Sequence, residues 1–146
     1  MDIKRGVDCI GVTVSFLCHD GQGNIVLHKR SKNCRDEHGI WDGGGGALEF
    51  GESLEDCLAR EVREEYCVDI LEAKFVGVVN QLREHEGKPT HWVSIVHAVL
   101  VDRPLVKIGE PEKMDDLAWF PMDALPTPAF RTLKQEIQMA NDAGVL

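Results

Sequence analysis

Three glutamates at helical spacing, Glu61, Glu64 and Glu65, are the residues of this sequence best suited to chemistry. They continue, at about 3.6 residues per turn, the apolar stripe of an amphipathic helix that begins at Leu54. Like charges on one helix face repel, and partial burial raises their pKa values unless a cation lies among them. Hard divalent cations take such all-oxygen sites. The pattern therefore predicts a divalent-metal site on this helix.

The elements around these acids follow from capping and glycine signals. Ser53 is a natural N-cap, and Asp56 three residues later gives a pattern like a capping box, so the helix is expected over residues 54–66. Four glycines, residues 43–46, precede it. A run of this kind predicts a flexible loop that loses much entropy when it is ordered.

Composition restricts the class of protein. The chain has 146 residues, 43% of them apolar and 28% charged, which suits one globular domain spanning residues 1–146. A net charge of −9 argues against a nucleic-acid polymer as partner. With no apolar run of roughly 20 residues and no signal-like N-terminus, we expect a cytoplasmic protein without a membrane partner. The five cysteines never form CxxC, which favours reduced thiols.

The remaining elements are read from β-branched runs and turn residues. The order of the elements, with one central helix between strands and a late helix, predicts an α/β or α+β layered domain. Strands are expected at residues 9–18 and 25–30, joined as a hairpin, within 70–83, and at 91–101 and 117–120, with turns at 19–24 and 85–89 and a helix over 129–140.

The spacing of Gly46, Glu52 and the run Arg60-Glu61-Val62-Arg63-Glu64-Glu65 resembles the Nudix box, G-x5-E-x7-R-E-U-x-E-E-x-G-U, where U is aliphatic. Val68 supplies the last aliphatic position. Cys67 departs from the pattern, because it replaces a glycine suited to a left-handed helix cap. Gly44 also stands where the family commonly has proline. Neither departure removes a predicted metal ligand.

This resemblance implies an α/β fold, a Nudix-type α/β/α sandwich with a mixed central sheet and a glutamate-rich catalytic helix. It implies a hydrolase that cleaves a nucleoside diphosphate linked to another group, with Mg²⁺ as cofactor and Mn²⁺ possible. Flanking segments resemble the nucleoside-triphosphate diphosphatase branch, in which a homodimer is common. The favoured substrate is a free nucleoside triphosphate. The alternatives are an ADP-ribose or nucleoside diphosphate sugar pyrophosphatase, a non-catalytic nucleotide sensor and a purely structural metal site.

The resemblance also assigns metal-binding roles. Glu64 and Glu65 are the implied ligands, and Glu61 is either a ligand or a residue that acts as, or places, the general base. The backbone carbonyl near Gly45–Gly46 would be a further ligand, because glycine lets the main chain approach closely. A later loop often supplies another acid in this family, for which Glu112 is the candidate and Glu110 the second choice.

The other implied roles concern orientation and substrate binding. Arg60 would orient a box glutamate, often Glu52, through a bidentate ion pair, a geometry that suits arginine better than lysine. Arg30, at the end of a predicted strand, is the candidate for phosphate binding, and Gly45 would contact substrate through its main chain. Asn80 is the candidate for reading a base edge, with its neighbour Gln81 a weaker one.

Overall fold

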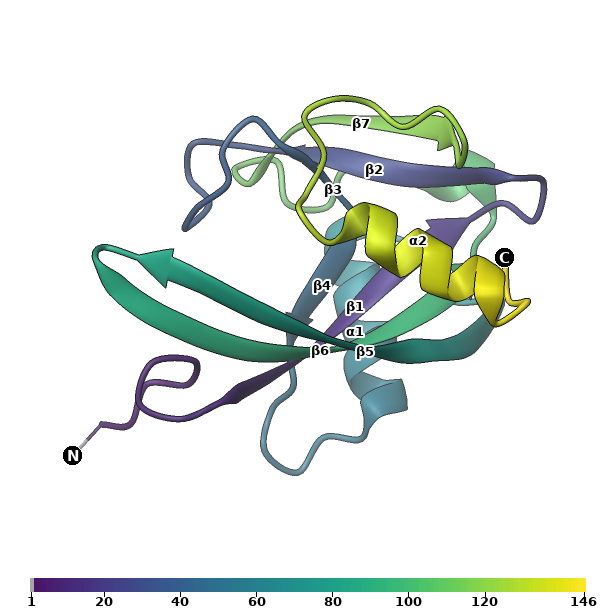
Figure 1. Cartoon of the computed structure of the whole chain (residues 1–146). Coiled ribbons are helices and arrows are strands. Elements are labelled where there is room, and N and C mark those ends of the chain that lie inside the picture. The colour runs from purple at the N-terminus through teal and green to yellow at the C-terminus, as the bar shows by residue number, and fades with distance from the viewer. Residues whose placement is uncertain (1) are drawn as a thin grey trace.

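The computed structural model describes residues 2–146, in which a mixed seven-stranded sheet lies between two helices (Figure 1). The predicted fold class is confirmed. No helix within residues 2–146 is long and apolar enough to span a membrane. The elements in chain order are β1 (Gly11–His19), β2 (Asn24–Arg30), β3 (Trp41–Asp42), β4 (Gly44–Ala47), α1 (Leu54–Tyr66), β5 (Glu72–His85), β6 (Lys88–Leu100), a 3-10 turn (Arg103–Leu105), β7 (Met114–Pro121) and α2 (Leu133–Asp142).

Strand β1 is the centre of the sheet. It runs parallel to β6, with Val14 opposite Ile95, and antiparallel to β4, with Val14 opposite Gly46. The path β3-β2-β1-β6-β5 is completed by β7, which pairs with β2. The predicted hairpin of β1 and β2 is present, but its only pair in the ladder is His19 with Ile25, since β2 turns away to β7.

Alternation along β1 fills two separate cores, because successive side chains point to opposite faces of a strand. Phe16 joins the core beneath α1, where its ring packs edge-on against Tyr66 with the ring centroids 6.0 Å apart. Leu17 joins the core beneath α2, with Leu133 and Ile137. The sheet thus holds α1 on one face and α2 on the other, the layering that the sequence predicts (Figure 1).

The glycine run differs from the predicted flexible loop. Most of it forms β4, which is hydrogen-bonded to β1 through four residue pairs. A Cβ at Gly44 would overlap the Phe16 ring, and one at Gly45 would lie 2.8 Å from the Val14 carbonyl oxygen. Glycine is therefore needed here because the strand packs closely against its neighbours, and the segment is ordered.

Two other bounds also shift. The turn between β5 and β6 shrinks to Glu86 and Gly87, both with positive φ, as in the two-residue turns that match strand twist. Helix α2 begins later than predicted, because Pro128 and Phe130 hydrogen-bond to the backbone of Trp41 instead of joining the helix. Helix α1 has the bounds that the sequence predicts.

Candidate active site

Helix α1 presents the three glutamates to different degrees. Its N-terminus is capped by Ser53, whose side chain accepts a hydrogen bond from the Asp56 amide. Further along, the Glu61 and Glu64 side chains are 12% and 49% exposed, and Glu65 is 7% exposed as a residue. The predicted acidic continuation of the apolar stripe is present, and its members range from a buried carboxylate to a half-exposed one.

Arg60 is the centre of the ion-pair network on this helix. Its Nε and Nη2 atoms donate to the two carboxylate oxygens of Glu52 at 2.8 and 3.0 Å, the bidentate geometry expected. Nη1 donates to Glu61 at 2.8 Å and lies 3.5 Å from Glu64. The hydrogen bond from Arg60 lowers the pKa of Glu52 to about 2. One guanidinium therefore positions three acids and keeps Glu52 ionised.

The glycine strand forms the opposite wall of this acidic site. A Cβ at Gly46 would overlap the Glu61 carboxylate, so glycine is required for the two elements to meet. The amide of Gly45 donates to Glu65 Oε2 at 3.0 Å. Strand β4 thus brings the main chain of the box directly against its acids.

The C-terminal end of α1 determines which acid of the following loop lies near the helix glutamates. Cys67 has φ 60°, the left-handed conformation expected for the cap, and the Gly109 amide donates to the Glu65 carbonyl at 2.9 Å. This contact places Glu110 among the acids. Glu112, the sequence candidate, is exposed and uses its carbonyl to accept from Ser31 and Asn33. Because the contact at Gly109 sets the register, the structure places Glu110 in the acid cavity and leaves Glu112 outside it, which makes Glu110 the better-placed candidate for the loop acid.

Burial and repulsion together make this site suited to a divalent cation. Desolvation raises the pKa values of Glu61 and Glu65, and the charge of Glu110 raises both further. Within residues 2–146, no three His, Cys, Asp or Glu side chains are gathered as a ready metal cage. The carboxylates instead contact Arg60 and the Gly45 amide. Their all-oxygen chemistry and mutual repulsion fit a hard cation, which would offset their charge.

Two cavities meet at the glycine strand. The acid cavity, of about 380 Å³, contains the glutamates and three cationic side chains. The sheet cavity, of about 330 Å³, lies between polar residues of the sheet and the start of α2. Residues of the acid cavity include Glu61, Glu64, Glu65, Glu110, Arg30, Arg35 and Lys113, and those of the sheet cavity include Thr13, Ser15, Ser94, Gln81, Asp42, Arg83, Phe130 and Glu136.

The predicted substrate residues divide between these cavities and the surface. Arg30 and Gly45 line both cavities. Asn80 does not reach either one: it is exposed and hydrogen-bonds to His91 Nε2 at 2.9 Å. Gln81, on the other face of β5, lines the sheet cavity and donates to Thr132 at 2.9 Å. Gln81 is thus better placed than Asn80 to contact a base, and the base-edge role stays a prediction.

Several lining residues had no assigned role in the sequence, namely Arg35, Arg83, Phe130 and Glu136. Arg83 could have been found from the two-residue alternation of β5, since Val79, Gln81 and Arg83 share a face. Glu136 carried no such signal. It is 6% exposed, and burial followed by the charge of Asp42 raises its pKa to about 8.

Comparison with known proteins agrees with this fold. The model of the NUDIX domain matches residues 10–139. The NAD-capped RNA hydrolase NudC of Pseudomonas aeruginosa is 32% identical over 117 residues, which are 80% of this chain and 39% of that protein. NudC of Stutzerimonas stutzeri is 33% identical over 129 residues, which are 84% of this chain and 43% of that protein. The chain thus spans about two fifths of these curated relatives.

Solved structures give the same result. The MutT NUDIX hydrolase from Burkholderia pseudomallei has a TM-score of 0.78 at 26% identity, over 89% of this chain and 97% of that one. The NUDIX domain of Shewanella oneidensis NrtR, complexed with ADP ribose, has a TM-score of 0.73 at 22% identity, over 97% of this chain and 90% of that one, and supports the fold alone. The chain belongs to the NUDIX family. Hydrolases of this family generally use divalent metal ions.

Proposed function

We propose that this protein uses Mg²⁺ to hydrolyse a nucleoside triphosphate to the monophosphate and pyrophosphate. The observation that carries this proposal is the junction of the two cavities at Gly45 and Gly46. The acid cavity combines carboxylates for metal with cations for phosphate. The adjoining sheet cavity, of about 330 Å³, lies within the range of small-molecule sites and suits one nucleoside.

The metal-binding roles follow from position. Glu64 is the most exposed of the three helix acids and Glu65 is fixed by the Gly45 amide, so both can hold an ion at the mouth of the cavity. The Gly46 carbonyl and Glu110 would complete the set. When bound, Mg²⁺ would offset phosphate charge and lower the pKa of an attacking water.

Glu61 has a separate role in this proposal. Arg60 holds one of its oxygens at 2.8 Å, and burial raises its pKa, which makes it a better proton acceptor than an ordinary glutamate. Glu61 therefore either completes the metal site or accepts the proton of the attacking water. Arg60 and Glu52 act as positioning residues, since their bidentate pair fixes the guanidinium that holds Glu61.

A second candidate is hydrolysis of a larger pyrophosphate substrate, such as ADP-ribose, a nucleoside diphosphate sugar or a dinucleotide like NAD. The names of the NudC relatives and the ADP-ribose complex of the NrtR domain favour it. The RNA part of a capped transcript is a poorer fit, because the net charge of −9 opposes a polyanion. A triphosphate is favoured over the larger pyrophosphate substrates and over capped RNA. It needs room for only one nucleoside beside the acids, which the sheet cavity provides.

The test is a panel of substrates incubated with Mg²⁺ and analysed by chromatography of the products. A triphosphate should give the monophosphate and pyrophosphate, without orthophosphate. Cleavage of ADP-ribose or NAD at a rate higher than every triphosphate would favour the second candidate. Binding without turnover on the whole panel would instead indicate a nucleotide sensor.

A further inference from the structure

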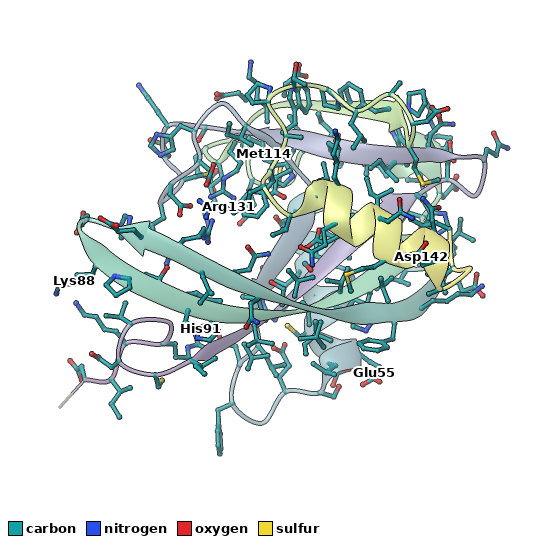
Figure 2. All side chains as sticks on the ribbon, in the orientation of Figure 1. Glu55, Lys88, His91, Met114, Arg131 and Asp142 are labelled. Carbon is teal, nitrogen blue, oxygen red and sulfur yellow. The ribbon has the colours of Figure 1, made fainter. Side chains whose placement is uncertain are left out.

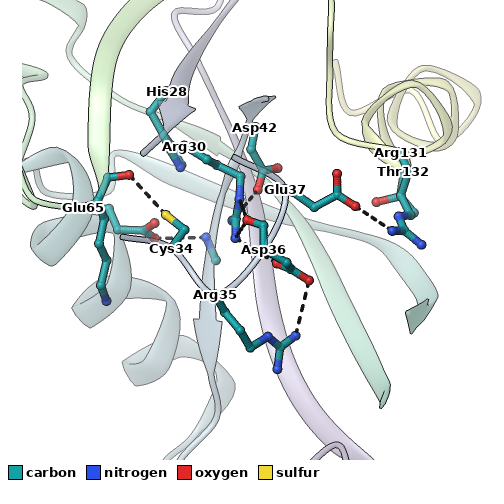
Figure 3. Close-up of polar contacts among 12 residues, drawn as sticks. His28, Arg30, Cys34, Arg35, Asp36, Glu37, Asp42, Glu65, Arg131 and Thr132 are labelled. Carbon is teal, nitrogen blue, oxygen red and sulfur yellow. Dashed lines mark hydrogen bonds and ion pairs between the residues drawn. The ribbon is translucent and has the colours of Figure 1, made fainter. Parts of the chain in front are cut away.

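Three arginines surround the Asp36 carboxylate where the two cavities meet, and Figure 3 shows two of them, Arg30 and Arg35, beside it. Arg30 Nη2 lies 3.2 Å from Asp36 Oδ1, and Arg83 Nη1 lies 3.2 Å from Asp36 Oδ2. Arg35 Nη2 lies 3.9 Å from the same carboxylate. Arg30, Arg35, Asp36 and Arg83 together are called the arginine cluster below. Its charged groups are mostly buried, with the Arg30, Asp36 and Arg83 side chains 13–18% exposed.

The contacts of Asp36 are long for their type. Charge-assisted bonds between nitrogen and carboxylate oxygen are ordinarily about 2.7–2.9 Å, and arginine often forms two in parallel. In the arginine cluster every side-chain contact of Asp36 is 3.2 Å or longer, and Arg83 Nη1 lies 3.2 Å from each of its two oxygens. The carboxylate is therefore shared among three cations without forming a close pair with any of them.

Arg30 also donates to the Asp36 carbonyl, from Nε at 3.1 Å and Nη2 at 3.0 Å, and to Asp42 from Nη1 at 3.3 Å. Even with these acceptors counted, the cluster has more donors than it uses. Each guanidinium carries five N–H groups, whereas a carboxylate accepts about four hydrogen bonds. Within residues 2–146, Arg83 Nε has no hydrogen-bond partner. Arg83 and Arg30 both lie over the Phe130 ring, at 5.4 and 6.0 Å from its centroid, which holds the guanidinium groups at the cavity wall.

The Asp36 side chain is not the main anchor of its own loop, residues 31–39, since the Asp36 carbonyl already accepts hydrogen bonds from Arg30 Nε and Nη2 at 3.1 and 3.0 Å. At one end Ser31 and Asn33 donate to the Glu112 carbonyl at 2.6 and 2.8 Å. At the other end Glu37 pairs with Arg131 at 2.6 Å. A role in anchoring is thus already filled by neighbouring contacts. The distinctive property of Asp36 is its position beside both cavities, since Arg30 and Arg35 line the two of them.

We propose that Arg30, Arg35 and Arg83 form a phosphate subsite in which Asp36 is an exchangeable internal ligand. A phosphate group of the nucleotide replaces the Asp36 carboxylate, because it offers more acceptor oxygens and more negative charge to the same guanidinium groups. The subsite deepens the proposed function, on which the identity of its phosphate as part of a nucleotide rests. Asp36 then acts as a competitor that weakens phosphate binding and favours release.

The test measures binding of inorganic phosphate by calorimetry, in EDTA and without nucleotide, so that neither metal nor turnover contributes. Asp36→Asn removes the competing charge with little change of shape and should bind phosphate about tenfold more tightly. Arg83→Gln should bind it about tenfold more weakly. Glu37→Gln, on the same loop, is the matched control and should stay within about twofold.

An affinity of Asp36→Asn equal to or weaker than that of the wild type would overturn the proposal. If that variant does not fold, the wild type still tests it by NMR. Adding phosphate should shift the Asp36 side-chain carbon and the Arg30 and Arg83 Nε–H signals together, and unchanged Asp36 would refute the exchange. Failure of the proposed hydrolysis is a separate result, since phosphate binding in EDTA does not require it.

Discussion

Two arginine–carboxylate networks flank the glycine strand. They differ in the distances between their charged atoms and in how far apart the partners lie in the sequence. Arg60 meets Glu52 in a bidentate pair at 2.8 and 3.0 Å, within one box and only eight residues apart. Arg83 meets Asp36 at 3.2 Å across 47 residues, in a contact shared with two more arginines. The difference indicates a fixed network that positions acids and an exchangeable one that receives phosphate.

The largest effect on activity should come from weakening the fixed network around Arg60. Arg60→Lys keeps the charge but cannot form the fork to Glu52 while also holding Glu61. Misplaced acids should lower kcat by about 10²-fold with a smaller change in KM. Steady-state kinetics on the best substrate checks this. A kcat within threefold of wild type would mean that the fork is not needed, and Arg63→Lys, on the exposed side of α1, is the control.

Adding a methyl group to the glycine strand should separate activity from stability. Gly46→Ala places a Cβ on the Glu61 carboxylate and should reduce kcat about tenfold or more. Gly44→Ala presses on the Phe16 ring and should lower the free energy of unfolding by about 1–3 kcal/mol. Kinetics and urea unfolding of both variants test the contrast. Equal losses of activity in two well-folded variants would contradict a specific role for Gly46.

The sheet-cavity side can be tested by pH. Burial and the charge of Asp42 raise the pKa of Glu136 from 4.5 to about 8, so between these values the folded protein binds more protons than the unfolded chain. Its contribution should therefore lower the free energy of unfolding by on the order of 4 kcal/mol as pH rises from about 4.5 to 8. Urea unfolding should show that the free energy of unfolding of Glu136→Gln changes less with pH over this window than that of the wild type. An identical slope in both proteins would show that Glu136 ionises normally.

The smallest effect concerns Cys67, the residue that caps the C-terminus of α1. Cys67 adopts φ 60°, a conformation that costs a non-glycine residue about 1–2 kcal/mol. Cys67→Gly relieves this cost but gains unfolded-state entropy, so a net stabilisation of about 0.5–1 kcal/mol is expected. Cys67→Ala retains the strain and serves as control. If both substitutions change the free energy of unfolding equally, strain at this cap is not the cause.

The same contrast of local and distant contacts explains what the sequence could predict. The family, the α/β/α layering, the bounds of α1 and the Arg60–Glu52 pair all follow from signals within one element or one box. The glycine run was misjudged as a loop, because its pairing with β1 depends on the approach of Phe16, about thirty residues earlier.

Contacts between segments far apart in the sequence determine which of the other residues line the cavities. Glu110 lies closer to the helix acids than the sequence candidate Glu112, because the Gly109 amide donates to the Glu65 carbonyl, a contact between segments far apart in the sequence. Gln81 and not Asn80 lines the sheet cavity, because packing sets which face of β5 meets α2, although the apolar type of Val79 could have indicated that face. Arg83 shares a face of β5 with Val79 and Gln81, so strand alternation could have indicated it. The positions of Arg35 and Glu136 at the cavities had no local signal.

The most direct test of the central claim is the hydrolysis rate of Glu64→Gln on the best substrate at saturating Mg²⁺. Glu55→Gln is the matched control, since Glu55 is exposed on the same helix and lies far from Met114 of the acid cavity (Figure 2). If Glu64 holds metal, its variant should lose about 10³-fold or more in kcat while the control stays within about twofold of wild type. An unchanged rate in Glu64→Gln would contradict the assignment of the acidic end of α1 as the catalytic metal site.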